Sequence, residues 1–577
     1  MSKSLKKSNK IQRLRNEFRL AVGSLVSEIL DRCSQPLPEQ PQALWSNFLE
    51  IFDMVQELRN LQAKNDFSQA KGIIDHVIEA MDRSTQSQID EFLNVWCKKR
   101  GIAVAPGVEI AVFNGYGLGL KASQSIEQGA IVLTVPRNAI ITSDLCRKNN
   151  LEEVVKADPM LKGMPNVLLA VVLLCECAKF DSLTPSLWTD YFSKLPRRFL
   201  TPLYYKKRHF EMLFRSGSCV NDVAINAANM VISIARQYCY FYQLMSTKSK
   251  GFEKTPLNTD TFTYDSYRWA VSVVMTRINY IPNPVGNEDG SRNSSTVSVP
   301  NIKDNVNVSA LIPLWDMANH SEGQMCTDFD TANDRGVLYA MKDYNVGDQI
   351  FINYGKRSNA EILIYNGFVY DNNTQSPTQV PIKIGLSKSD TLFQLRSTLL
   401  SYGGLDSSSQ VFPVTQNSLD NTLLYFSLIF NSCESELISF KVKAGEEKIL
   451  ESMVAGAKDG IINHDRLIGQ LLNLLISCTS NDTQLKSWQF LGTRFQLILR
   501  QHQATIEENE SFIASECVNA NNNLTTLNNE VCEDSEDATG QSDEDNDIEL
   551  TIRRFVLERQ KILSSAVKCC LEQVASL

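Results

Sequence analysis

The chain has 577 residues, 43% of them hydrophobic and 21% charged, with a formal net charge of −9 at pH 7. This composition supplies a sizeable apolar core and suffices for about two to four domains. The acidic balance argues against sequence-independent binding of nucleic acid, which requires clustered Lys and Arg. No apolar run reaches the roughly 20 residues that a membrane-spanning helix needs, so we expect no membrane segment.

Residues 1–100 are predicted to form an N-terminal helical region. Apolar residues recur at helical spacing in residues 11–33 and again in residues 44–62, and a proline-containing loop lies between these stretches. The first residues of the chain are basic and lack the apolar stretch of a secretory signal. We interpret them as the solvated start of a helix, with a mitochondrial presequence as the alternative.

The middle of the chain alternates between short β segments and helices. Residues 108–142 mix β-branched residues with glycine turns, residues 150–250 return to a helical pattern, and β segments reappear from residue 310. One β core with a helical insertion explains this order with fewer assumptions than two β domains, and the fold class is α+β. We predict a core at residues 101–355 with an insertion at about 150–280, a connection at 356–386, and a C-terminal all-helical domain at 387–577.

Two polar segments are predicted to be loops. Residues 284–307 are rich in Gly, Asn and Ser, and residues 515–547 are rich in Asn and then acidic. Such composition cannot bury enough apolar area to offset the entropy of ordering the chain. We therefore expect an extended loop at 284–307 and a disordered, solvated loop at 515–547, with binding of a partner as the alternative for the acidic segment.

Cysteine and histidine spacing gives no metal signal. The five histidines are scattered, and the 14 cysteines include no C-x-x-C pair. We therefore expect reduced thiols and no metal site.

Four short motifs combine residue types that ligand sites use. Glycines at alternate positions let the backbone adopt φ > 0 and approach a ligand, and polar residues after a strand can form a cluster at its end. Each motif alone also has a plain structural explanation: a glycine-rich hairpin, a core histidine, a packed tyrosine and an ordinary turn. The motifs are Gly115–Gly119, Leu314–Ser321, Ile352–Gly355 and Asn366–Phe368.

Taken together and in this order, the motifs resemble the pattern of the SET methyltransferases: a GxG loop, an R-x-N helix end, an N-H pair, a Y-G pair and a G-F turn. Residues 265–282, 310–320 and 352–373 are similar in particular to the actin-histidine methyltransferases. The C-terminal helices look like the substrate-binding domain of the Rubisco large-subunit methyltransferase group. The resemblance also implies a knotted core, in which the N-H and Y-G segments are threaded together.

The resemblance implies S-adenosylmethionine as the cofactor. It also implies which residues bind it, because the cofactor-binding positions of the family can be matched one by one to this chain. The matching residues are Arg83, Tyr116, Gly117, Leu118, Arg277, Asp316, Met317, Ala318, Asn319, His320, Asn366, Gly367 and Phe368.

The catalytic residues implied by the resemblance are Tyr354 and Asn279. An imidazole with a pKa near 6.5 is largely neutral at pH 7 and can attack a methyl group directly, whereas a lysine must first lose a proton. An acceptor that holds Nδ1–H leaves the Nε2 lone pair free, and Asn279 matches the residue that does this in histidine-specific enzymes. The alternative is that Asn279 only caps the helix before it. The implied substrate contacts are Trp315, which could instead be a core residue, Ile352, Arg236 and Arg357.

We therefore expect a protein-histidine N-methyltransferase that modifies the Nε2 (tele) nitrogen of a histidine in actin. We expect it to act as a monomer in the cytoplasm, with nuclear access left open. A lysine methyltransferase and a non-catalytic SET-derived binding module are the alternatives; activity on lysine peptides and binding of S-adenosylmethionine distinguish them. The chain departs from its relatives at Tyr116, where an acidic residue is usual, at Asn353, where an aromatic residue is usual, and in the longer loop at 284–307.

Overall fold

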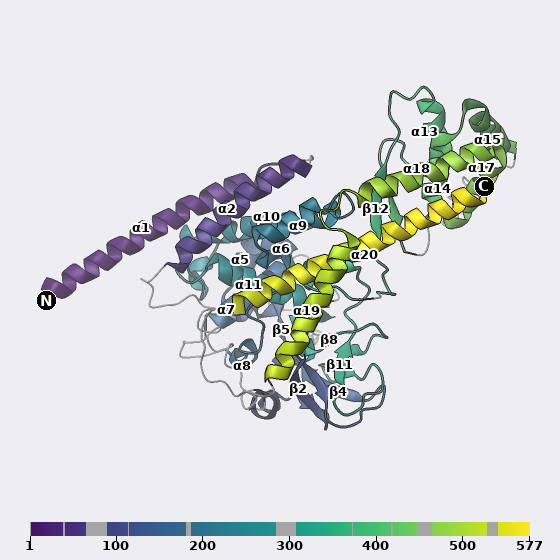
Figure 1. The fold of residues 1–577 in the computed structure, drawn as a ribbon. Coiled ribbons are helices and arrows are strands. Elements are labelled where there is room, and N and C mark those ends of the chain that lie inside the picture. The colour runs from purple at the N-terminus through teal and green to yellow at the C-terminus, as the bar shows by residue number, and fades with distance from the viewer. Residues whose placement is uncertain are drawn as a thin grey trace, which may run out of the picture. The chain divides into compact units, whose positions relative to one another are not determined.

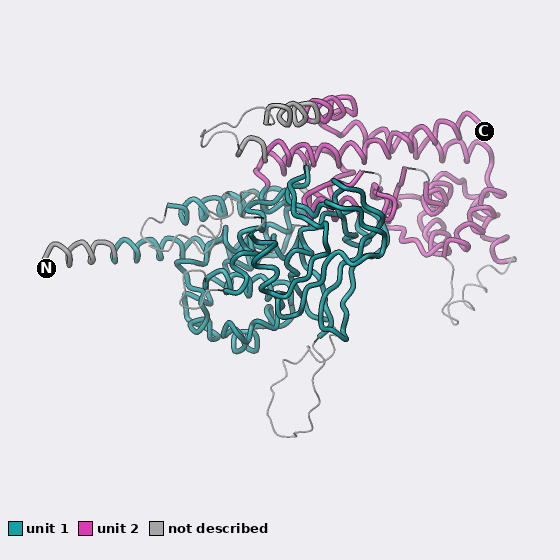
Figure 2. The backbone as a smooth tube through the Cα atoms, turned by 90° about the horizontal axis from the view of Figure 1, so that it is seen from below, with its two compact units in different colours: residues 1–204, 227–357 teal, residues 205–226, 358–577 magenta. Residues whose placement is uncertain are grey.

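The computed structural model places most of the chain in two compact units (Figure 2). The first unit contains residues 1–204 and 227–357, and the second contains residues 205–226 and 358–577. Part of the predicted insertion, residues 205–226, therefore belongs to the second unit. The residues described are 2–38, 41–64, 89, 91–113, 115–179, 186–283, 307–371, 373–416, 419–446, 464–527 and 540–577.

The first unit begins with helices, as the periodicity predicts. Helices α1 (Ser2–Cys33) and α2 (Pro41–Ala63) pack together. Val26 and Ile29 of α1 and Phe48 and Ile51 of α2 are fully buried, because the apolar stripe of each amphipathic helix faces the interior. A short π-helical segment, η1 (Phe92–Cys97), precedes the first strand.

The β core of the first unit consists of three small sheets, with strand orders β1-β4-β10-β9, β2-β3-β11-β8 and β5-β7-β6. Figure 1 labels β2, β4, β5, β8 and β11 of this core. Strand β4 pairs with β10 and β5 pairs with β7, so segments on either side of the helical insertion share sheets. The prediction of one β core interrupted by helices is confirmed. The strands are β1 (Ala103–Val104), β2 (Val108–Phe113), β3 (Gly117–Ala122), β4 (Ile131–Pro136), β5 (Ile141–Thr142), β6 (Asn279–Pro282), β7 (Asn307–Leu311), β8 (Asn319–His320), β9 (Thr327–Asp330), β10 (Arg335–Tyr339) and β11 (Gln349–Ile352).

The insertion is helical and is built around α7, whose residues from Val167 to Cys177 are all buried. A helix that is apolar on all sides belongs in the interior, and α7 packs against α11. Helix α10 begins in the second unit and continues in the first. The insertion helices are α5 (Glu152–Ala157), α6 (Pro159–Gly163), α7 (Pro165–Cys177), α8 (Thr189–Phe192), α9 (Lys207–Arg215), α10 (Asn221–Ser246) and α11 (Tyr264–Arg277).

The second unit is mainly helical but contains a two-stranded antiparallel sheet of β12 and β13. The prediction of an all-helical domain from residue 387 is therefore wrong at β13. The segment Gln410–Val414 carries two valines and a phenylalanine, which favour a strand once β12 offers a partner. The elements are α12 (Asn359–Tyr365), β12 (Val380–Ile384), α13 (Phe393–Tyr402), β13 (Gln410–Val414), α14 (Asn421–Asn431), α15 (Glu434–Glu446), α17 (His464–Cys478), α18 (Asn481–Leu499), α19 (Ile506–Leu527) and α20 (Gly540–Ser576).

The predicted loop at 515–547 is partly wrong as well. Helix α19 continues to Leu527 and α20 begins at Gly540, so both ends of this segment are helical. The two helices pack against each other, and helices in proteins are stabilised mainly by tertiary packing rather than by local propensity. The predicted extended loop at 284–307 lies outside the described residues except for Asn307, the first residue of β7.

Within the described part of the chain, no helix is both long and apolar enough to cross a membrane. In the same residues, no group of three or more His, Cys, Asp or Glu side chains is arranged to hold a metal ion.

Candidate active site

Three of the predicted motifs meet in one sheet of the first unit. Strand β8, which consists of Asn319 and His320, pairs in parallel with Phe351 and Ile352 of β11. The other edge of β11 pairs with β3, the strand that follows the glycine-rich turn. Residues some 200 positions apart in the sequence therefore lie on adjacent strands.

Tyr354 lies directly after β11 and contacts the 314–320 segment twice. Its hydroxyl donates a hydrogen bond to the carbonyl of Ala318 over 3.0 Å, and its backbone N–H donates to Nδ1 of His320 over 3.1 Å. The two rings stack with centroids 5.1 Å apart. Burial raises the pKa of the Tyr354 hydroxyl to about 12, so this hydroxyl stays protonated at neutral pH.

His320 is a neutral structural partner of Tyr354. Burial lowers the pKa of the His320 imidazole below its ordinary value. A neutral ring leaves Nδ1 free to accept the bond from the Tyr354 N–H. The N-H and Y-G motifs are thus joined through the ring of His320.

The glycine-rich turn connects β2 to β3, and each glycine meets a specific constraint. Gly115 and Gly117 have φ of 74° and 70°, the left-handed region that favours glycine. A Cβ on Gly119 would lie 2.5 Å from the Gln349 side-chain nitrogen and 3.0 Å from that of Asn319. The Asn319 amide also donates to the carbonyl of Leu118 over 3.2 Å, so Gly119 permits β3 to approach β8 and β11 closely.

Arg277 is the last residue of α11 and contacts the 314–320 segment. Its Nη1 donates to the carbonyl of Asp316 over 3.4 Å. The carboxylate of Asp316 accepts a short hydrogen bond from the hydroxyl of Tyr191. Burial raises the pKa of Asp316 to about 6, although Arg277 and the bond from Tyr191 oppose the rise.

The backbone is strained two residues before Asp316, at Leu314. Leu314 has φ of 69°, which is rare for a bulky side chain and costs on the order of 1–3 kcal/mol. Trp315 follows, is 4% exposed, and packs its ring against Gly336 of β10. This packing supports the core interpretation of Trp315, and its predicted role as a wall of the substrate pocket stays a prediction.

Asn279 opens β6, two residues after the end of α11. Its side-chain nitrogen donates to the carbonyl of Arg277 over 3.1 Å, which satisfies one of the terminal carbonyls of the helix. Among the described residues, none donates a hydrogen bond to its side-chain oxygen. Asn279 therefore caps the helix with its NH₂ group and keeps its oxygen as an acceptor, so the two interpretations of this residue are compatible.

Four buried polar atoms of this region have no hydrogen-bond partner among the described residues. Such atoms cost about 1–3 kcal/mol each when nothing pairs with them. Their concentration around the 314–320 segment indicates a place for a polar ligand. The atoms are Nε of Arg277, Nε1 of Trp315, Oδ1 of Asp316 and the side-chain nitrogen of Gln349.

Several predicted residues lie near the site without a described ligand role. Tyr116 is 52% exposed, with its ring edge against Phe351. Met317 and Ile352 are buried, and Arg357 is partly exposed in the segment after Tyr354. Asn353, where the family has an aromatic residue, is buried and bonds through its side chain to the carbonyl of Gly323 and the N–H of Gly355.

Other predicted residues are not joined to the site by the structure. Arg236 is exposed on α10, close enough to Cys33 of α1 for its charge to act on the thiol. The turn Asn366–Phe368 follows α12 in the second unit, where Gly367 has φ of 81° and terminates the helix. Arg83 lies outside the described residues. The roles predicted for these residues stay predictions.

The sequence did not reveal three residues of the site. Tyr191 holds the Asp316 carboxylate but lies in an ordinary helical turn, α8, with no motif around it. Gln349 looks like any polar residue at the start of a strand, and the strain at Leu314 leaves no mark on residue type. These residues belong to the site only because segments distant in the sequence lie close together in the fold.

Comparisons with known proteins agree with this arrangement. The SET domain model matches residues 117–355, and the Rubisco LSMT substrate-binding model matches residues 387–563. The crystal structure of the SET domain of LSMT bound to lysine and AdoHcy has a TM-score of 0.55 at 17% identity, covering 85% of this chain and 92% of that one. The structure of Rubisco LSMT bound to AdoMet has a TM-score of 0.53 at the same identity and coverage. The fold and the site define a SET-domain methyltransferase.

The similarity in sequence is higher to one group within this class. The actin-histidine N-methyltransferases of Gallus gallus and Homo sapiens are 35% and 34% identical to the chain over 492 residues. The alignments cover 85% of this chain and 72% of each relative. The chain belongs to the actin-histidine N-methyltransferase family.

Proposed function

We propose that this protein transfers a methyl group from S-adenosylmethionine to the Nε2 (tele) nitrogen of a histidine in actin. The names of the relatives support actin as the substrate. The observation that carries histidine as the acceptor is Asn279, whose side-chain NH₂ is occupied by the Arg277 carbonyl. Its oxygen can accept the Nδ1–H of an imidazole, which leaves the Nε2 lone pair available for attack.

The methyl donor is S-adenosylmethionine, which supplies an electrophilic methyl group on its sulfonium. The side chains around the 314–320 segment suit this ligand. Arg277 has a spare donor for a carboxylate, and Asp316 has a spare acceptor for an ammonium group. The turn Tyr116–Leu118 and the segment Asp316–His320 would hold the remainder, and Asn366–Phe368 stays a predicted cofactor contact.

Tyr354 acts as a positioning and electrostatic group. Because its pKa is raised to about 12, its hydroxyl keeps its proton and does not serve as a base at neutral pH. A neutral imidazole needs no base before the attack, since its ordinary pKa is near 6.5. The work left to the protein is alignment of donor and acceptor in a site with fixed dipoles.

Mass spectrometry of monomeric actin incubated with the protein and S-adenosylmethionine tests the proposal. We expect one additional methyl group on a single actin histidine, formed about 10- to 100-fold more slowly with Tyr354→Phe at the same protein concentration. Methylation of a lysine instead would support the lysine methyltransferase, and cofactor binding without any methylated actin would show that the substrate is wrong. Absence of cofactor binding would support the non-catalytic module.

We also propose that the protein is a monomer located in the cytoplasm, with access to the nucleus left open. Size-exclusion chromatography with light scattering and fractionation of cells test the two statements.

A further inference from the structure

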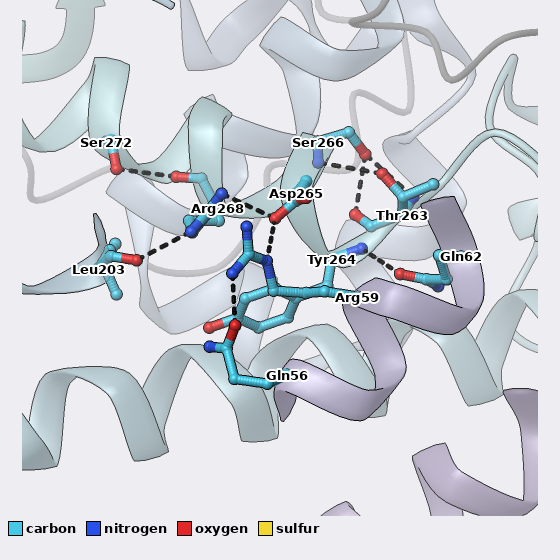
Figure 3. Close-up of polar contacts among 10 residues, drawn as sticks. All are labelled: Gln56, Arg59, Gln62, Leu203, Thr263, Tyr264, Asp265, Ser266, Arg268 and Ser272. Carbon is cyan, nitrogen blue, oxygen red and sulfur yellow. Dashed lines mark hydrogen bonds and ion pairs between the residues drawn. The ribbon is translucent and has the colours of Figure 1, made fainter. Parts of the chain in front are cut away.

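The N-terminal helix α2 contacts the helix that carries part of the active site. Helix α2 precedes the residues matched by both family models, so neither model assigns α2 a role. Figure 3 shows side chains of α2 directed at the first turn of α11, and the two helices pack together. Both helices belong to the first unit.

Gln62 of α2 caps α11 from outside. Its side-chain oxygen accepts a hydrogen bond from the N–H of Tyr264 over 2.9 Å. This N–H is one of the first four of the helix, which have no partner within it. The Gln62 nitrogen also donates to the hydroxyl of Tyr238 in α10 over 2.6 Å, and that hydroxyl donates to the carbonyl of Phe262.

Arg59 of α2 forms the second contact. Its Nε donates to Oδ1 of Asp265 over 2.7 Å, and Arg268 of α11 reaches the same oxygen over 2.8 Å. The other branch of Arg59 donates to Gln56 over 2.7 Å, which fixes the plane of the guanidinium (Figure 3). Because the planar guanidinium of Arg59 is bonded at two points, it fixes both the direction and the distance of Asp265 relative to α2.

The start of α11 is itself well defined. Thr263 and Ser266 form a reciprocal capping box, with bonds of 3.1 Å and 3.0 Å. Asp265 in the first turn also interacts favourably with the helix dipole. A displacement of the first turn is therefore transmitted to the helix rather than absorbed by fraying.

Two hydrogen bonds hold the middle of α11, so we treat this point as the one about which the helix would tilt. Tyr267 donates to Gln237 over 2.8 Å, and the Trp269 indole donates to the Pro196 carbonyl over 2.9 Å. At 1.5 Å per residue, the first turn lies about 6 Å from this point and Arg277 about 13 Å on the other side. A tilt that shifts the first turn therefore moves Arg277 about twice as far.

We propose that the face of α2 formed by Gln56, Arg59 and Gln62 positions α11, so that Arg59 and Gln62 are positioning residues for methyl transfer that act through Arg277 and Asn279. The inference rests on the proposed function for the role of these two residues. Small displacements of binding groups matter, because a misplacement of about 1 Å can cost about 100-fold in rate.

Full-length Arg59→Gln and Gln62→Leu variants test the proposal. We expect S-adenosylhomocysteine to bind about three- to tenfold more weakly in isothermal titration calorimetry, with a similar loss of kcat on actin. Arg13→Gln is the matched control, because Arg13 pairs with Glu17 on its own exposed helix face. Unchanged affinity and kcat in both α2 variants would overturn the proposal.

A double-mutant cycle with Arg277→Lys separates positioning from general stability. If Arg59 acts through Arg277, the effect of Arg59→Gln on S-adenosylhomocysteine affinity should shrink in the Arg277→Lys background. Fully additive effects would overturn the inference. The cycle measures ligand binding and not methylation. A wild-type protein that binds S-adenosylhomocysteine but does not methylate actin would therefore refute the proposed function, and the cycle would still test whether Arg59 acts through Arg277.

If Arg59→Gln does not fold, Arg59→Lys replaces it in the same cycle. Lysine keeps the charge opposite Asp265 but loses the fork that also reaches Gln56. We expect a folded variant with a smaller loss of ligand affinity that is again coupled to Arg277→Lys. Wild-type affinity in Arg59→Lys would show that charge alone is needed and would overturn the positioning role of the guanidinium plane.

Discussion

Tyr354 contacts the 314–320 segment through two separate groups, its hydroxyl and its backbone N–H. Its backbone N–H bonds to His320, and its hydroxyl bonds to Ala318. Removing the hydroxyl leaves the ring and the backbone contact in place. We therefore expect Tyr354→Phe to lower kcat about 10- to 100-fold while the affinity for S-adenosylhomocysteine changes less than twofold. Single-turnover kinetics and calorimetry measure the two quantities, and equal losses in both would make the tyrosine structural.

The proposed choice of imidazole over amine rests on Asn279. We expect Asn279→Phe to lower methylation of histidine more than tenfold and to favour a lysine-containing peptide, because no acceptor then holds Nδ1–H. Mass spectrometry of paired histidine and lysine peptides measures the ratio. Asn279→Gln keeps both the acceptor and an amide donor for the Arg277 carbonyl and serves as the control. Histidine methylation at the wild-type rate in Asn279→Phe would remove the tautomer argument.

The buried carboxylate of Asp316 lowers the free energy of unfolding at neutral pH. Burial raises the pKa of its carboxyl to about 6 in the folded protein, against an ordinary value of 3.8. The folded protein therefore holds this proton more tightly than the unfolded chain, and stability falls as pH rises from about 4 to about 6.

We expect Asp316→Asn to raise the free energy of unfolding at pH 7 by up to about 3 kcal/mol and to weaken cofactor binding. Urea unfolding at pH 5 and pH 7 measures the first effect, and calorimetric titration the second. The gain in stability should be smaller at pH 5, where the wild-type carboxyl is mostly protonated. A variant less stable than the wild type at pH 7 would contradict this account.

The residue types of the site were predictable from the sequence, but their partners were not. Tyr354, Asn279 and Arg277 stand in motifs whose order resembles the family. Tyr191 lies in no motif, and its contact with Asp316 exists only because α8 folds against the 314–320 segment.

At the scale of elements, Glu436 joins two helices of the second unit. Its carboxylate accepts hydrogen bonds from the N–H of Cys433 and from the N–H of Ser480, so one side chain caps both α15 and α18. The hydroxyl of Thr483 adds a third bond. Burial alone would raise the pKa of Glu436, but these bonds outweigh it and lower the pKa to about 2.

We expect Glu436→Ala to lower the free energy of unfolding at pH 7 by about 2 kcal/mol, because two helix N-termini lose an acceptor. The lowered pKa means that the contribution is present above the ordinary value of 4.5 and is lost as pH falls towards 2. Denaturant unfolding as a function of pH measures both effects. Glu434→Ala, at an exposed position of the same helix turn, should change stability by less than about 0.5 kcal/mol.

Elements with strong periodicity were predicted well, and weakly patterned ones were not. The helices at both ends and the β segments of the core follow from apolar spacing. Strand β13 forms its ladder of hydrogen bonds with β12, and this contact joins segments that the local pattern does not connect.

For the whole molecule, hydrogen exchange tests which segments the cofactor contacts. The predicted contacts lie in three segments, Tyr116–Leu118, Asp316–His320 and Asn366–Phe368. A ligand that binds only the folded state stabilises that state by about 2.7 kcal/mol at 100 times its Kd, and the amides that it contacts exchange more slowly.

We expect S-adenosylhomocysteine to slow hydrogen exchange in all three segments, as measured by mass spectrometry of peptic peptides. Helix α17 (His464–Cys478) serves as an internal reference and should not change. Protection confined to the first unit would remove Asn366–Phe368 from the set of cofactor-binding residues.

The helical ends, the interrupted β core, the order of the four motifs and the likeness to a family follow from the sequence alone, because they depend on residue type and spacing along the chain. The tertiary structure was needed to show that Tyr191 holds Asp316 and that α2 contacts the start of α11. These two contacts join residues 125 and 202 positions apart. Local pattern carries no information about such contacts, because hydrogen bonds and apolar packing between distant segments form only once the chain has folded.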